Sequence, residues 1–280
     1  MEKARSEHYY VPSSSIYPVM LAAGLFLLAL GFILYINGHG AGTWFMAAGV
    51  ALVAYVLFGW FGSVVAETQG GRFHGWEERS FRWGMAWFIA SEVMFFGAFF
   101  GALFYLRNIA VPALGHTGLL WPGYPGTWPT SGPAGQPFTP MAAWGIPALN
   151  TLILLSSGAT VTWAHWGLLK NRRPQMIAGL ALTVLLGFAF LGFQAHEYAH
   201  AYNELGLTLG AGVYGATFFM LTGFHGFHVT VGAIALTAIL GRTLKGHFTP
   251  DDHFGFEGVA WYWHFVDVVW LMLFVFVYWI

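Results

Sequence analysis

Seven apolar runs divide this chain of 280 residues, and each is long enough to cross a membrane as a helix. About 20 helical residues span the roughly 30 Å hydrocarbon core of a bilayer, where backbone groups must find their hydrogen-bond partners within the segment. The sequence therefore predicts an all-α membrane protein with seven transmembrane helices. The expected spans are Tyr17–Ile36, Thr43–Ala66, Gly84–Leu106, Ala143–Leu169, Met176–Ala195, Val213–Leu240 and Gly258–Ile280.

The composition supports the same class and excludes several others. Hydrophobic residues make up 57% of the chain and charged residues only 8%, whereas about a quarter of the residues in soluble domains are charged. The formal net charge of −1 offers no basic surface to phosphates, so we expect no nucleic-acid partner. Cysteine is absent, which excludes disulfides, thiolate catalysis and cysteine-ligated metal.

The distribution of Lys and Arg predicts the orientation in the membrane. If the N-terminus is cytoplasmic, only Arg107 of the 11 Lys and Arg residues lies on the outer side. Cytoplasmic loops are enriched in these residues, so we expect an N-in, C-out topology. The residues expected on the inner side are Lys3, Arg5, Arg72, Arg79, Arg82, Lys170, Arg172, Arg173, Arg242 and Lys245.

The spans divide the chain into four segments. Residues 1–16 are expected to form a polar cytoplasmic N-terminus and residues 17–66 a two-helix transmembrane bundle. Residues 67–83 would form a cytoplasmic loop, and residues 84–280 a five-helix transmembrane bundle. The exterior loop at 107–142 holds seven of the 12 prolines; with its Gly and Trp residues it is expected to be irregular and to lie along the membrane surface.

Two carboxyl groups fall inside the expected spans. Glu92 lies eight residues into the third span and Asp267 nine residues into the seventh, which places both about 12 Å or slightly more from the inner end. Equal depth suggests a shared site, with His264 and His165 in the same layer. An intramembrane ionisable residue is by default a functional candidate, although each carboxyl group could instead bond a neighbouring helix and hold the bundle together.

His225 and His228 lie three residues apart in the sixth span, on roughly one helical face. A haem with two histidine ligands needs them on opposite sides of the porphyrin, so these two cannot both ligate one haem. The glycines at 223, 226 and 232 favour close helix packing, with the histidines bonding between helices.

The stretch "HEYAH" at residues 196–200 matches the H-E-x-x-H signature of zinc metalloproteases. On a helix its two histidines would share one face and could hold zinc while the glutamate activates a water molecule. A zinc site also needs a third protein ligand, and the exterior candidates are Glu204, His39 and His116. We therefore keep an intramembrane zinc metalloprotease as an alternative, and expect no metal on this chain.

Five blocks of the sequence, in order, resemble subunit III of the haem–copper cytochrome c oxidases. They are "RWGMAWFIASEVMFFGAFF" (82–100), "PALNTLILLSSGATVTWAHW" (147–166), "GFQAHEY" (192–198), "YGATFFMLTGFHGFHV" (214–229) and "HFGFEGVAWYWHFVDVVWLMLFVFVYW" (253–279). The resemblance runs from about Ser15 to the last residue. Seven helices favour a cytochrome c oxidase over the related quinol oxidases, whose third subunit resembles only the last five. An accessory subunit of a quinol oxidase or a nitric oxide reductase remains an alternative.

The resemblance implies an accessory subunit without a redox centre, catalytic residue or cofactor of its own. Oxidase subunit I would be its main contact and subunit II would belong to the same complex, with haem and copper on these partner subunits and cytochrome c as electron donor. A V-shaped cleft filled with phospholipid would separate helices 1–2 from helices 3–7. The subunit would stabilise the catalytic subunit and sustain proton uptake in a bacterial inner membrane, with its C-terminus in the periplasm.

The resemblance also implies roles for single residues. Glu92 is similar to the family's buried carboxylate in the third helix, and Asp267 is the second intramembrane carboxylate. Arg242 resembles a basic residue that meets lipid phosphate, so we predict lipid head-group binding at Arg242, and assign His225 and His228 to the same role. Structural polar roles are expected for Glu197, Tyr198, His264 and Glu257.

Overall fold

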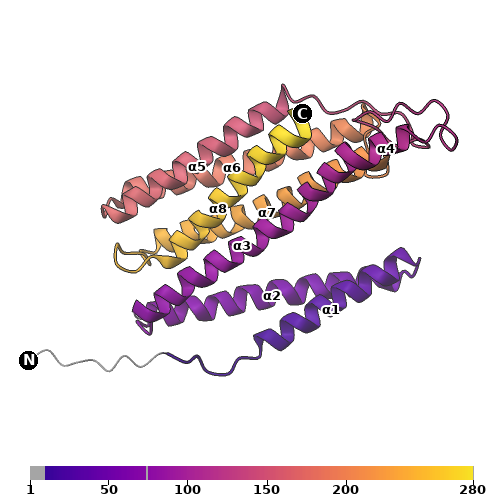
Figure 1. The fold of residues 1–280 in the computed structure, drawn as a ribbon. Coiled ribbons are helices and arrows are strands. Elements are labelled where there is room, and N and C mark those ends of the chain that lie inside the picture. Colours follow the sequence, from indigo (N-terminus) through magenta and orange to yellow (C-terminus); the bar gives the residue numbers. More distant parts are fainter. Residues whose placement is uncertain (1–9, 74, 280) are drawn as a thin grey trace, which may run out of the picture. The chain divides into compact units, whose positions relative to one another are not determined.

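The structure is a computed structural model that describes residues 10–73 and 75–279 (Figure 1). Within these ranges it contains seven helices long and apolar enough to cross a membrane. No strand occurs in the described part of the chain. The predicted class, an all-α protein with seven transmembrane helices, is confirmed.

The helices reach beyond the apolar runs, because several polar first and last turns are helical as well. The spanning elements are α1 (Tyr17–Ile36), α2 (Ala41–Gln69), α3 (Gly75–Tyr105), α5 (Ile146–Leu169), α6 (Arg173–Asn203), α7 (Gly212–Leu244) and α8 (Phe254–Leu273). Three short elements extend two of them: η1 (Leu106–Ala110) and α4 (Val111–Gly115) follow α3, and η2 (Phe274–Trp279) follows α8. Proline in the first turn begins α1, α5 and α6, where its missing N–H has no helical acceptor to lose.

Both loops that flank the third span are shorter than expected. The expected cytoplasmic loop at 67–83 is largely helical, because α2 runs to Gln69 and α3 begins at Gly75. The exterior loop expected at 107–142 begins only after Gly115 and continues to residue 145. Hydropathy alone finds the apolar part of a helix and misses its polar ends.

The chain divides between Phe81 and Arg82 into two compact units. In the first unit, α1 and α2 pack along four buried glycines, with Gly24 against Gly49 and Gly31 against Gly42. A Cβ atom added at Gly31 would lie 2.5 Å from a backbone nitrogen of α2. The two backbones therefore approach as closely as small residues permit, a common way to pair helices in lipid.

In the second unit, α5 to α8 pack around fully buried aromatic rings. Trp263 lies over Gly187 and Gly232, where an added Cβ atom would approach the ring to 2.9 and 2.8 Å. Its indole N–H donates to Oγ of Ser157 at 2.9 Å. The glycines make room for the ring, and the serine satisfies its one polar group.

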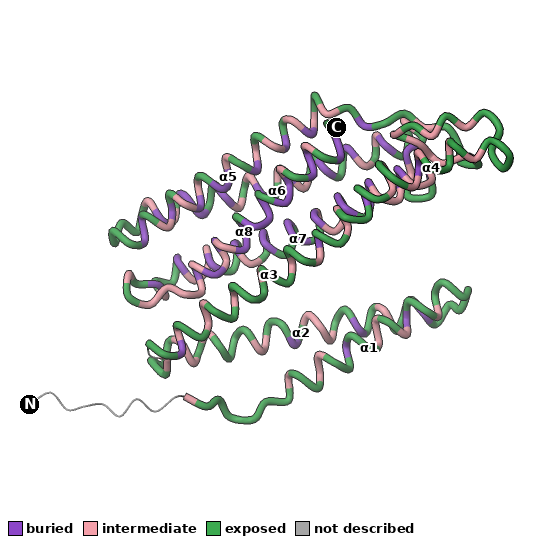
Figure 2. Tube along the Cα trace, viewed as in Figure 1, coloured by how far each residue is buried: buried purple, intermediate pink, exposed green. Residues whose placement is uncertain are grey.

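The part of α3 that belongs to the second unit packs through large rings. Phe95 meets Phe224 of α7 at 5.0 Å between ring centroids, and Phe88 meets Tyr262 of α8 at 6.2 Å. Burial is nevertheless concentrated in α5 to α8 (Figure 2). In the most apolar window of α8 56% of the residues are buried, against 11% for α3, so α8 is the central helix of this unit.

The exterior loop is fixed to the start of α7. The backbone N–H of Tyr214 donates to the carbonyl of Thr130 at 3.2 Å, and the ring of Phe138 stacks on Tyr214 at 5.1 Å. Trp128, expected to lie on the membrane surface, packs edge-on against the same tyrosine at 5.5 Å. Tyr214 therefore holds the loop against the bundle.

Close packing of α1 and α2 predicts a measurable effect of one methyl group. A Cβ atom at Gly42 would overlap the backbone of Tyr35, so Gly42→Ala should lower the free energy of unfolding of the first unit by about 1–3 kcal/mol. Gly62, also on α2, has nothing within 4 Å of an added Cβ atom. Gly62→Ala is the control and should be neutral or stabilising by up to ~1 kcal/mol. Thermal unfolding in detergent, followed by tryptophan fluorescence, measures both, and equal melting temperatures would contradict the close packing.

Candidate functional site

Glu92 of α3 and His228 of α7 form a hydrogen-bonded pair in the second unit. Nε2 of His228 lies 2.9 Å from Oε2 of Glu92, and Nδ1 lies 2.6 Å from the carbonyl oxygen of Phe224. Because a carbonyl oxygen only accepts, Nδ1 must carry a proton. Nε2 then either accepts a proton from the carboxyl group or donates one to the carboxylate, so the pair shares one proton in both states.

Aromatic side chains surround this pair. The side chain of Glu92 is only 20% exposed and that of His228 only 10%. A low-dielectric environment strengthens the hydrogen bond and makes it costly to separate the two groups. The rings within 6.5 Å of the imidazole centroid belong to Phe95, Phe96, Phe227, Tyr262 and Phe265.

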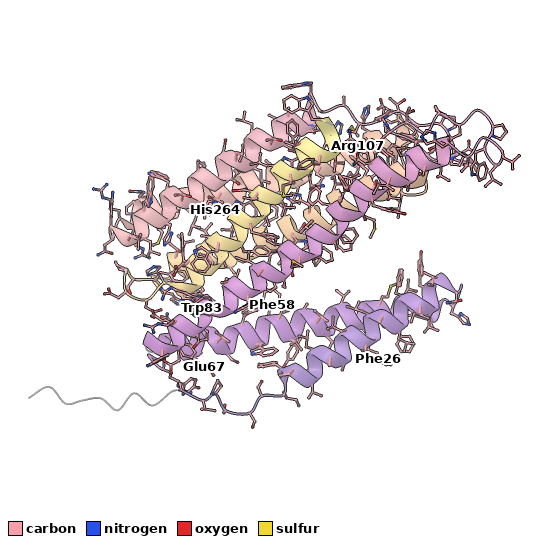
Figure 3. All side chains as sticks on the ribbon, viewed as in Figure 1. Phe26, Phe58, Glu67, Trp83, Arg107 and His264 are labelled. Atoms are coloured by element: carbon pink, nitrogen blue, oxygen red, sulfur yellow. The ribbon has the colours of Figure 1, made fainter. Side chains whose placement is uncertain are left out.

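A second polar group lies between α5 and α8. Oδ2 of Asp267 lies 3.6 Å from Nδ1 of His264, and Nε2 of His264 lies 3.1 Å from Oγ1 of Thr162. A Cβ atom at Gly158 would overlap the carboxyl group, so only glycine admits it. The Asp267 side chain is 8% exposed, whereas that of His264, labelled in Figure 3, is 46% exposed. The carboxyl group of this pair is therefore buried, whereas its imidazole is half-exposed.

The structure does not join the two intramembrane carboxyl groups in the shared site suggested by their depth. Glu92 pairs with a histidine of α7, and Asp267 with a histidine of its own helix. His165, expected in the same layer, lies against His253 with 5.7 Å between ring centroids. Equal depth did not imply contact, because helices place residues of one layer on different faces.

His225 and His228 do not fit the lipid head-group role expected for them. His225 is fully buried, and its Nε2 donates to the carbonyl of Val266 at 3.2 Å. Its ring lies between Phe190 and Trp270, at centroid distances of 5.7 and 5.1 Å. A residue enclosed among apolar rings cannot reach a charged head group, so both histidines act between helices and only Arg242 keeps the lipid assignment.

Glu197 and Tyr198 connect the C-terminal end of α6 to two other elements. The hydroxyl of Tyr278 in η2 donates to Oε1 of Glu197 at 2.6 Å, and Tyr198 bonds Oγ1 of Thr222 in α7 at 2.7 Å. Gln194 adds a bond from Nε2 to the carbonyl of Thr222 at 3.0 Å. These bonds join three helix ends through buried polar atoms.

The same arrangement removes the groups that a zinc protease would need. Glu197, the expected general base, is 1% exposed and bonded within the bundle, while His196 faces outward. Nδ1 of His200 lies 3.1 Å from Oε2 of Glu204. In the described ranges 10–73 and 75–279, no three His, Cys, Asp or Glu residues form a metal-binding group. The motif therefore lacks an accessible base.

Two arginines stand at the end of the second unit that holds the start of α8. Nε of Arg82 lies 2.9 Å from Oε2 of Glu257, in the first turn of α8, where a carboxylate is favoured by the helix dipole. The guanidinium group of Arg242 lies 4.5 Å from the ring centroid of Phe248 and close to Gly255. Its Nε is buried without a hydrogen-bond partner. Arg82 joins α3 to α8, and Arg242 is positioned with unused donors.

The sequence did not predict several of the side-chain contacts described above. Arg82 and Glu257 are 175 positions apart, and nothing in the sequence pairs them. Gly158 lies in the small-residue run "SSGAT", which indicates a close contact but not which carboxyl group fills it. Tyr278 was read only as part of an apolar span.

Comparison with known proteins identifies the relatives of this chain. The family model described as "Cytochrome c oxidase subunit III" matches residues 7–280. Among similar curated proteins, cytochrome c oxidase subunit 3 of Carassius auratus is 41% identical over 275 residues, which cover 97% of this chain and 96% of the relative. The protein of the same name from Marchantia polymorpha is 40% identical over 280 residues, covering 100% of this chain and 98% of the relative.

The enclosure of Glu92 predicts selective chemical modification. A hydrophobic carbodiimide partitions into apolar surroundings and modifies the carboxyl groups enclosed there. We expect labelling of Glu92 at least about tenfold above that of Glu78, which lies in the first turns of α3; peptide mass spectrometry measures both. His228→Phe should change the labelling rate of Glu92, because it removes the group that shares the proton. Equal labelling of Glu92 and Glu78 would show that Glu92 has no special environment.

Proposed function

The chain belongs to the cytochrome c oxidase subunit III family, and on this basis we propose that it is the third subunit of a proton-pumping cytochrome c oxidase. It is a multi-pass membrane protein and a subunit of an oxidoreductase complex. The proposal adds that it holds no redox centre, binds phospholipid, stabilises the catalytic subunit and sustains proton uptake. Haem and copper would lie on subunits I and II, with cytochrome c as donor, in a bacterial inner membrane with an N-in topology.

One observation carries the proposal: the family match covers residues 7–280, including both helices of the first unit. This chain aligns with 93% to 98% of the length of relatives named cytochrome c oxidase subunit 3. A five-helix accessory subunit of the quinol oxidase kind would not account for α1 and α2. This supports a cytochrome c oxidase over the quinol oxidase and nitric oxide reductase alternatives.

The half-exposed polar group between α5 and α8 supports a specific contact with subunit I. On α8 the exposed side chains form one narrow stripe, which includes His264, Val268 and Met272. His264 lies ten residues into a span of 26 residues, near the middle of the membrane. An imidazole bonded to a buried carboxyl group is costly to expose to hydrocarbon there. We propose that subunit I covers this face and offers His264 a polar partner.

Arg242 supports the proposed lipid binding. It is the basic residue in the last turn of α7, it packs on Phe248, and its Nε has no partner in the part of the chain that the structure describes. A guanidinium group at the end of a span, packed on a ring and with an unpaired N–H donor, suits the phosphate of a lipid head group.

The pair of Glu92 and His228 supports an indirect role of this chain in proton uptake. Their shared proton and aromatic enclosure suit a group that holds a proton near the partner subunit. No redox chemistry on this chain is required, because the proposed subunit acts by keeping the catalytic subunit supplied and stable.

Purification of a tagged chain from its host membrane tests the function and the proposed contact together. We expect a haem- and copper-containing partner to co-purify and the zinc content to stay far below one per chain. Ala159 lies one turn from Thr162 on the exposed side of α5, so Ala159→Trp should reduce the recovered partner by more than about half, because overpacking disrupts a fitted interface. Leu185→Trp, on the exposed side of α6, is the control. Stoichiometric zinc that disappears in His196→Ala would favour the protease, and equal partner recovery from both tryptophan variants would reject the α5–α8 contact.

The lipid assignment is tested by counting phospholipids in the purified complex. Arg242→Ala should remove about one tightly bound phospholipid per complex, because the phosphate loses its charged donor. Lys245→Ala changes the same charge on a neighbouring exposed residue and should leave the count unchanged. An unaltered count in Arg242→Ala would remove Arg242 from the lipid site.

A further inference from the structure

A small cavity lies where the turn between α5 and α6 meets the C-terminal end of α7. Its volume is about 50 Å³. Its lining includes the polar residues Asn171, Arg172, Arg173 and Thr243, together with Gly167, Leu168, Met176, Gly246 and Phe248. One water molecule needs roughly 10–15 Å³ of such space, so the cavity has room for a few waters or for one tetrahedral oxyanion.

Thr243 is the unusual member of this lining. It is 0% exposed, and its hydroxyl has no hydrogen-bond partner among residues 10–73 and 75–279. Other threonines of α7, such as Thr230 and Thr237, donate to the carbonyl one turn before them. The Thr243 hydroxyl makes no such bond, and Thr243 is one of the residues that line the cavity. Leaving a buried hydroxyl unpaired is unfavourable, so this donor points to a ligand that accepts hydrogen bonds.

Positive charge surrounds the same cavity. Nη2 of Arg173 donates to the carbonyl of Leu244 at 2.7 Å, which fixes the guanidinium group at the cavity and leaves its other N–H groups available. The side chain of Arg172 adds a second cation. α6 begins at Arg173, one of the lining residues, so the positive end of the helix dipole lies beside the cavity.

The carboxyl groups near this end of the bundle do not cancel that charge. Asp251 and Asp252 lie in the turn between α7 and α8, and neither lines the cavity. Lys170 and Lys245, both exposed, add to the positive surface. The ligand that matches these donors, charges and dimensions is a small oxyanion.

We propose that this cavity binds a phosphate group, with Thr243, Arg172 and Arg173 as donors. The phosphate is either that of a membrane phospholipid or free inorganic phosphate, since both present the same tetrahedral oxygens. Basic pockets between helix ends at the membrane surface suit anionic head groups. The site is separate from Arg242, which does not line the cavity, so it stands or falls independently of the proposed function.

Two variants and one control test the site in the purified complex. Thr243→Val keeps the shape of the side chain and removes only the hydroxyl. Arg173→Gln removes the fixed cation. Each should weaken phosphate binding about tenfold or more, the loss expected for a hydrogen bond to a charged group. Lys245→Gln, on the same surface but outside the cavity, should change it less than about twofold to threefold, because screened surface charges interact weakly.

Two measurements separate the sources of the phosphate. Native mass spectrometry counts phospholipids retained by each variant, and equilibrium dialysis with radiolabelled inorganic phosphate measures binding after exchange into detergent. One phospholipid lost in both cavity variants identifies a lipid, whereas saturable phosphate binding lost in both identifies the free ion; either result supports the site.

Thermal unfolding shows that the variants are folded. Thr243→Val should melt at the same temperature as the wild-type chain or higher without phosphate, since an unpaired buried hydroxyl is removed. Added phosphate should stabilise the wild type and not this variant. Phosphate binding and phospholipid counts that are unchanged in Thr243→Val would overturn the proposal, even if Arg173→Gln reduced them, because the effect would then be one of surface charge alone.

Discussion

Hydrocarbon offers no hydrogen-bond partner, and the polar contacts of this protein follow from that constraint. Polar side chains within a span must find their partners on the protein. Many Ser and Thr hydroxyls bond a carbonyl of their own helix, and a smaller set of side chains bonds another helix. Glu92 joins α3 to α7, Ser157 joins α5 to Trp263 of α8, and Glu197 joins α6 to Tyr278 of η2. Dispersion forces alone would allow many packings of apolar helices; these bonds favour one arrangement of the second unit.

The degree of exposure separates the polar groups that hold this unit together from those that meet something else. His225 and Glu197 are enclosed, and each bonds another helical element through one atom, Nε2 or Oε1. Their other polar atoms, Nδ1 and Oε2, are buried without a partner among the described residues. His264 and Arg242 have polar atoms at the surface of the bundle or unused donors. The first kind fixes the helices. The second kind carries the proposed contacts with subunit I and with phospholipid, and Thr243 extends the same reasoning to a phosphate.

Some of this could be predicted from residues alone, and the misses have physical causes. Apolar length predicted the seven helices, but their polar ends, as at Gly75, lie beyond the signal that hydropathy measures. Depth along a helix suggested one layer for Glu92 and Asp267, yet the faces they occupy depend on how neighbouring helices pack. His225 and His228 were assigned to lipid together with Arg242 under the family resemblance; their enclosure depends on rings from other helices, such as Trp270.

The sequence by itself determined the class of the protein, its helices and its family, because these depend on local hydropathy and on ordered blocks such as "WHFVDVVW" at 263–270. Only the tertiary structure decided which polar groups meet. Helices far apart in the chain meet through Arg82 with Glu257 and through Gly158 with Asp267. The cavity at Thr243 is likewise lined by residues that are far apart in the chain. A single helix repeats its faces every 3.6 residues and carries no record of its neighbours, so the partners emerge only when the glycines and large rings have set how closely the helices pack.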